Sequence, residues 1–69
     1  MDPVPRGKVT EFDEYVGLGE VEGADGRRFL FHCVEIADGT RTIEVGTAVE
    51  FDLRVKFGRP EASQLRAVP

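Results

Sequence analysis

Residues 48–56 carry the clearest pattern in the sequence, a strict alternation of apolar and charged side chains. The apolar members are Val49, Phe51, Leu53 and Val55, and the charged members between them are Glu50, Asp52, Arg54 and Lys56. Successive side chains of a β-strand point to opposite faces of the sheet, so this alternation predicts a half-buried strand. Such strands are typical of antiparallel sheets, which cover one face and leave the other in water. We therefore expect a β-rich fold in which the four apolar side chains of this run face the core.

Two earlier segments also predict strands, each with a local irregularity. Residues 7–13 are rich in β-favouring side chains, but Val9 and Phe12 lie three positions apart. A regular strand cannot place such a pair on one face, so we expect a bulge or a sharp coil of the strand. Residues 17–22 alternate glycine with larger side chains, as a strand does where it passes close across another in a barrel.

A turn signal marks the start of the third strand. Asp25-Gly26 tolerates positive φ and predicts a hairpin into residues 27–33. The side chains expected to point inward from this strand are Phe29, Phe31 and Cys33. Those expected to point outward are Arg28, Leu30 and His32.

The last third of the chain adds a short turn and a final strand. Residues 34–37 are too few for an α-helix and predict one helical turn that places Ile36 under the barrel. A loop is expected at residues 38–41, and residues 61–68 form the last strand. In that strand Ser63, Leu65 and Ala67 alternate with Ala62, Gln64 and Arg66.

The length of 69 residues supports one domain and one small core. Five strands joined by glycine-rich turns favour a closed or partly closed barrel, because free edges on so short a sheet invite aggregation. We assign residues 6–69 to this domain. Residues 1–5 contain Pro3 and Pro5 and are expected to form a short lead-in.

The composition indicates the compartment and limits the partners. Cys33 is the only cysteine, so no disulfide forms within the chain and a reducing, cytoplasmic setting is expected. No apolar run is long enough to span a membrane, and residues 1–7 lack the apolar stretch of a secretory signal. Thirteen acidic residues against nine basic ones give a net charge of −4, which counts against tight binding of phosphates.

Four short motifs follow one another along the chain. They are Gly7-Lys8-Val9 with Phe12, Gly17-Leu18-Gly19, Phe29-Leu30-Phe31-His32, and Arg41-Thr42-Ile43-Glu44-Val45-Gly46 followed by Val49-Glu50-Phe51. In this order they resemble the motifs of the bacterial cold-shock proteins and of the cold-shock domain of Y-box proteins. The last motif is the most specific, since it matches the family's Arg-Thr-Leu-x-x-Gly-x-x-Val-x-Phe segment. The resemblance spans nearly the whole chain and implies an all-β, five-stranded antiparallel oligonucleotide-binding barrel of the cold-shock type.

The resemblance also implies a partner, single-stranded RNA or DNA. Members of the family stack bases on aromatic side chains and track the backbone with basic ones. Most of the stacking positions differ here: the residues that replace family aromatics are Glu11, Leu18, Glu20, Leu30, Cys33 and Thr40. We therefore expect weak binding. The residues expected to carry it are Lys8, Phe12, Leu18, Leu30, His32 and Arg41.

Other chemistry finds little support in the residues. His32 and Cys33 are neighbours in a strand, so they point to opposite faces, and no second ligand pair accompanies them for a metal. Gly17-Leu18-Gly19 lacks the third glycine or the lysine of a phosphate-binding loop. A barrel of this size with one histidine offers little room for a catalytic cleft, so we expect no enzyme, no cofactor and no small-molecule substrate.

A second hypothesis assigns the same surface to a protein partner. Leu18, Leu30 and Cys33 replace aromatics with smaller apolar groups, and Glu11 and Glu20 surround them with charge. An apolar patch with a charged rim is typical of protein interfaces. The acid-rich residues 11–15 are a further candidate for docking, through Phe12 and Tyr15, although a strand end followed by a solvated loop is the favoured interpretation.

Overall fold

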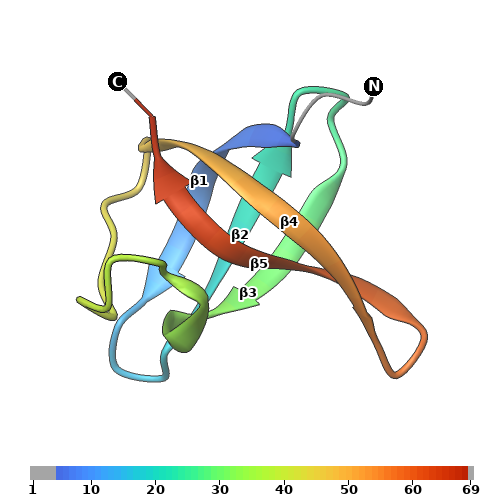
Figure 1. Ribbon diagram of the computed structural model, residues 1–69. Coiled ribbons are helices and arrows are strands. Elements are labelled where there is room, and N and C mark those ends of the chain that lie inside the picture. Colours follow the sequence, from blue (N-terminus) through green and yellow to red (C-terminus); the bar gives the residue numbers. More distant parts are fainter. Residues whose placement is uncertain (1–4, 69) are drawn as a thin grey trace.

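The computed structural model describes residues 5–68 and contains five strands and one 3₁₀ turn (Figure 1). These elements are β1 (Arg6–Asp13), β2 (Leu18–Gly23), β3 (Arg28–His32), η1 (Cys33–Glu35), β4 (Ala48–Lys56) and β5 (Arg59–Ala67). The strands close into a barrel in the order β1-β2-β3-β5-β4. The structure thus confirms the predicted five-stranded β-barrel. In the described residues no helix has the length and apolar character needed to cross a membrane.

One strand pairing differs from the all-antiparallel expectation. β1 pairs with β2 and β4, β2 with β3, and β4 with β5, all antiparallel. β3 and β5, however, run parallel and meet at Leu30 and Glu61. The reason is the chain path: residues 33–47 cross the end of the barrel before β4 starts, so the β4–β5 hairpin returns beside β3 in the same direction (Figure 1).

Apolar side chains from every strand meet inside the barrel. Phe31 and Val49 are fully buried, Phe51 is nearly so, and the Phe29 and Phe51 rings lie 5.9 Å apart. The other buried apolar residues are Val9, Val21, Ile36, Ala62 and Leu65. The prediction that Phe29, Phe31, Val49 and Phe51 fill the interior is confirmed.

The first strand bends as its apolar spacing predicts. The pairing of β1 with β2 shifts between Val9 and Glu11, which places a bulge at Thr10 and turns Phe12 to the same face as Val9. Gly19 of β2 faces the same interior. A Cβ at Gly19 would overlap the Phe31 ring and lie 2.8 Å from the Glu11 carbonyl oxygen. Glycine is therefore required there by the close crossing of the strands.

The turn after β3 closes one end of the barrel. The predicted helical turn occurs one residue earlier than expected, at Cys33–Glu35. Ile36 follows it, is buried, and bridges to Leu65 of β5. The Ser63 hydroxyl donates a 2.9 Å hydrogen bond to the Glu35 carboxylate, which ties this turn to β5.

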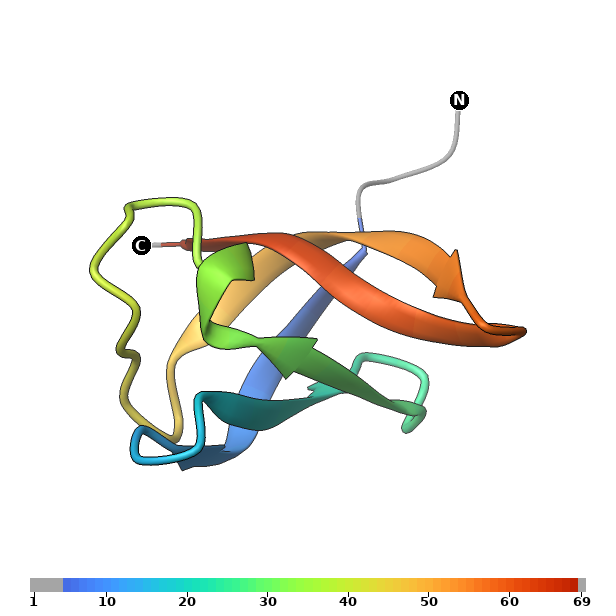
Figure 2. The same ribbon diagram turned by 90° about the horizontal axis from the view of Figure 1, so that it is seen from below.

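The expectation that the whole apolar face of β4 is buried is wrong for the second half of the strand. Leu53 and Val55 are 46% and 74% exposed. β1 pairs with β4 only at Ala48–Glu50, and from Asp52 onward the only strand in the described chain that pairs with β4 is β5. The β4–β5 hairpin consequently projects from the barrel (Figure 2).

The simple alternation predicted for the last strand is also wrong. Ala62 and Ser63 are consecutive and both buried. The pairing of β4 with β5 is irregular near Gln64, whose φ of 54° breaks the two-residue period. The predicted lead-in of residues 1–5 lies outside the described residues except for Pro5, whose carbonyl accepts a hydrogen bond from the Phe51 amide.

Candidate nucleic-acid interface

The outer face of β1, β2 and β3 is the surface on which the expected stacking positions fall. We call it the β1–β3 face. Strand pairing arranges its side chains in rows that run across the three strands. From one end to the other these rows are Lys8, Glu22 and Arg28; Glu11, Glu20 and Leu30; and Asp13, Leu18 and His32.

Leu18 and Leu30 lie on this outer face, as predicted. Leu30 is 43% exposed, and Leu18 is half-buried. Together they line a shallow depression of about 290 Å³, to which Glu11, Asp13 and Glu20 also contribute. Phe12 also lines it, so the depression combines apolar side chains with three carboxylates.

Acidic side chains dominate the electrostatics of the β1–β3 face. The Arg28 guanidinium lies 3.2 Å from a Glu20 carboxylate oxygen and 3.6 Å from one of Glu22. Arg28 is therefore already engaged by two carboxylates. Glu11 and Asp13 add further negative charge, so an approaching phosphate meets more repulsion than attraction at the centre of this face.

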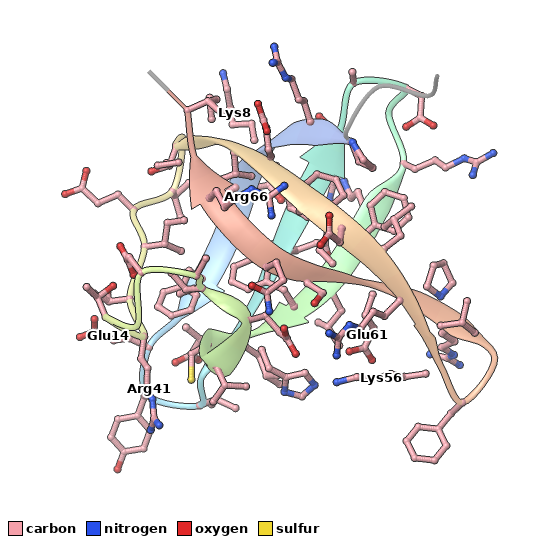
Figure 3. The ribbon with its side chains drawn as sticks, in the orientation of Figure 1. Lys8, Glu14, Arg41, Lys56, Glu61 and Arg66 are labelled. Atoms are coloured by element: carbon pink, nitrogen blue, oxygen red, sulfur yellow. The ribbon has the colours of Figure 1, made fainter. Side chains whose placement is uncertain are left out.

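His32 lies at the edge of the face, next to β5 and the projecting hairpin. Its Nε2 atom is 3.7 Å from the Glu61 carboxylate. Lys56 Nζ lies 4.0 Å from the same carboxylate and 3.9 Å from that of Glu35 (Figure 3). The histidine expected to contact nucleic acid thus lies in a network of charged side chains from three elements.

Phe12 lies between the core and the outer face, because it packs against the core and also lines the depression beside Leu18 and Leu30. Its ring stacks on Phe31 with centroids 5.9 Å apart and an interplanar angle of 4°. It is half-buried and packs against the core. The bulge at Thr10 is the physical cause, since it turns Phe12 inward. One ring face is therefore covered by Phe31 and is closed to a base.

The two predicted cations lie far from each other. Lys8 is exposed at one end of β1, whereas Arg41 sits in the long loop at the opposite end of the molecule (Figure 3). Lys8 joins the same row of the face as Glu22. The structure therefore groups Lys8, Leu18, Leu30 and His32 on one face and leaves Arg41 at its margin.

The loop that carries Arg41 is shaped by a hydrogen-bonded turn. Thr40 donates from its amide and its hydroxyl to the Asp38 carboxylate, at 3.0 and 2.8 Å. These two bonds hold the pKa of the exposed Asp38 carboxyl below its usual value. Arg41 follows with a positive φ of 60°, and Thr42 donates to Glu14 across the gap to the β1–β2 turn.

Cys33 and Tyr15 complete the surroundings of the site. Cys33 is partly buried against the core, so it adds little to an outer apolar patch. Tyr15 is 97% exposed in the β1–β2 turn. Glu61 was missed as a neighbour of His32, because the two residues are far apart in sequence and meet only through the parallel β3–β5 contact.

Comparison with known proteins supports the assignment of a family. A search of curated proteins finds no match to this chain. The sequence profile described as "'Cold-shock' DNA-binding domain" matches residues 5–68, which is almost the whole chain and all of the barrel. The motifs, the closed barrel and this match agree, and the chain belongs to the cold-shock DNA-binding domain family.

Proposed function

We propose that the protein binds single-stranded RNA or DNA weakly on the β1–β3 face. The observation that supports this most is the grouping of Lys8, Leu18, Leu30 and His32 on one outer face of a cold-shock barrel. Leucines offer apolar contact to bases, and Lys8 and His32 offer contacts to the backbone. Arg41 extends the contact at the margin. The single free cysteine is suited to a reducing compartment, and we place this function in the cytoplasm.

The weakness follows from the energetics of stacking. A base stacked on an aromatic side chain contributes about 1–3 kcal/mol. Glu11, Leu18, Glu20 and Leu30 stand where relatives carry aromatics, and even about 1 kcal/mol for each lost stack lowers affinity by about three decades. We therefore expect dissociation constants in the micromolar range or weaker.

A titration at two salt concentrations tests the proposal. Labelled oligo-U or oligo-dT is titrated with the protein at about 50 and 200 mM salt, and anisotropy is recorded. Two to three phosphate contacts predict about a tenfold loss of affinity over this range. Lys8→Gln should weaken binding, whereas Arg27→Gln should not, because Arg27 lies in the β2–β3 turn and already pairs with Asp25. Nanomolar affinity at low salt, or no binding at all, contradicts the proposal.

A protein partner is the second candidate for this surface. The observation that favours it is the depression whose lining combines apolar and acidic side chains. These are Phe12, Leu18, Leu30, Glu11, Asp13 and Glu20. A partner with an apolar anchor and a basic rim complements such a site. The titration separates the two candidates, because a protein partner leaves the oligonucleotide anisotropy unchanged at both salt concentrations.

A further inference from the structure

Phe57, in the turn between β4 and β5, has a backbone conformation that is unfavourable for an aromatic residue. Phe57 and Gly58 have φ values of 52° and 78°, so both turn residues are left-handed. Two-residue hairpin turns of this kind favour Asn-Gly or Asp-Gly, since bulky side chains are strained at positive φ. Local folding preferences therefore do not explain a phenylalanine at position 57.

The Phe57 ring is free to meet a ligand. It is fully exposed, and it ends a hairpin that extends away from the barrel (Figure 2). It adds nothing to the core, whose aromatic members are Phe29, Phe31 and Phe51. Strained residues that do not support packing concentrate at binding and catalytic sites. The combination of strain and exposure points to a binding role.

Cations surround this ring on both sides of the turn. Arg54, Lys56 and Arg59 flank it, and no aspartate or glutamate occurs between Asp52 and Glu61. In the described chain, the nearest ion pairs on this hairpin are those of Lys56, at 3.9 and 4.0 Å from Glu35 and Glu61. The hairpin tip is thus a positive region in a chain of net charge −4.

The tip is also continuous with the β1–β3 face. His32 lies 3.7 Å from Glu61, and Lys56 lies 4.0 Å from the same carboxylate. Figure 3 shows the Lys56 side chain reaching from the turn end of the hairpin toward Glu61. A strand of nucleic acid that leaves the β1–β3 face past His32 therefore reaches Lys56 next and the turn after it.

We propose that the tip of the β4–β5 hairpin is a second contact site for single-stranded nucleic acid. The Phe57 ring stacks on a base, and Arg54, Lys56 and Arg59 contact the neighbouring phosphates. An exposed aromatic among cations is the combination that sequence-tolerant single-strand binders use. The inference rests on the proposed function and goes beyond it, because it relocates stacking from the acidic β1–β3 face to the hairpin.

A protein partner on the hairpin fits less well. Leu53 and Val55 are exposed, but they alternate with Arg54 and Lys56, so the cations occupy the other side of β4. A purely apolar occupant of the Leu53 side leaves Arg54 and Arg59 without a role, whereas Lys56 already has Glu35 and Glu61 as partners. Phosphates satisfy Arg54 and Arg59 while Phe57 stacks on a base.

Two variants of the full chain test the inference. Phe57→Asn introduces the residue this turn favours, so it should preserve or raise the melting temperature while it removes the ring. We expect its affinity for oligo-dT of about 12 nucleotides to fall at least about fivefold. Arg59→Gln should weaken binding in the same assay, and Arg27→Gln, an exposed arginine of another turn, is the matched control.

Phe57→Trp gives an optical readout, because the chain contains no other tryptophan. Stacking predicts quenched emission when oligo-dT is added, reversed by salt, whereas Val45→Trp in the exposed 37–47 loop should report little change. Equal binding by wild type and Phe57→Asn overturns the hairpin site and leaves the proposed function standing. Absence of wild-type binding overturns both. The tryptophan emission can also change with protein concentration and not with oligo-dT. In that case the hairpin tip contacts a second copy of this chain, and the inference is overturned.

Discussion

Glu20 illustrates at the scale of one residue how the β1–β3 face differs from that of its relatives. It lies between Glu11 of β1 and Leu30 of β3, in the central row of the face, and Arg28 engages its carboxylate at 3.2 Å. The resemblance to the cold-shock family implies an aromatic ring at this position. The substitution therefore removes a stacking group and adds a negative charge where the phosphate backbone approaches.

Glu20→Phe is expected to strengthen binding of single-stranded oligonucleotides by at least about tenfold, since it restores one stack and removes one repulsive charge. Glu20→Gln removes the charge alone, so it should give only part of the gain. Anisotropy titrations of both variants beside wild type provide the measurement. If Glu20→Gln gains as much as Glu20→Phe, charge and not stacking limits the affinity.

At the scale of the strand, the crossing of β1 and β2 depends on Gly19. Its position beside the Phe31 ring and the Glu11 carbonyl leaves no room for a methyl group. Overpacking of this kind costs about 1–3 kcal/mol, which is a large part of the stability of so small a barrel. The same crossing holds Phe12 against Phe31.

Gly19→Ala is accordingly expected to lower the free energy of unfolding by about 1–3 kcal/mol. The control is Gly39→Ala, where a Cβ has open space and only the positive φ of 77° opposes it. Urea denaturation followed by circular dichroism measures both. Equal stability of Gly19→Ala and wild type would show that the crossing is looser than described.

Local spacing predicts some elements and not others. The three-residue interval between Val9 and Phe12 correctly predicts the bulge in β1, because a bulge is a local event. The alternation through Leu53 and Val55 correctly predicts a strand but wrongly predicts its burial. The burial of Leu53 and Val55 depends on where the pairing of β1 with β4 ends, and the local sequence pattern does not predict that position.

In the candidate site, too, the sequence predicts local features correctly and misses contacts between distant strands. The sequence places Leu18 and Leu30 on the outer face correctly, since both follow from strand period. The contact between His32 and Glu61 depends on the parallel β3–β5 pairing, a property of the closed barrel. The conformation of Phe57 is likewise invisible in the sequence, because Phe-Gly is not a favoured turn pair.

At the scale of the molecule, charge is unevenly distributed over the barrel. Acidic residues gather on the β1–β3 face, and Arg54, Lys56 and Arg59 gather on the projecting hairpin. A cold-shock barrel with a net charge of −4 can therefore still attract phosphates locally, at low salt, through one end of its surface. This distribution makes the proposed weak binding compatible with a net charge of −4.

A chemical-shift map with a poly-pyrimidine oligonucleotide tests the central claim most directly. The amide resonances of the whole chain are compared with and without the oligonucleotide, at low and at high salt. We predict salt-sensitive perturbations at Leu18, Leu30 and His32, continuing to Lys56 and Phe57 on the hairpin. An unperturbed spectrum at low salt, or perturbations confined to other surfaces of the barrel, would contradict the claim that this cold-shock domain binds single strands.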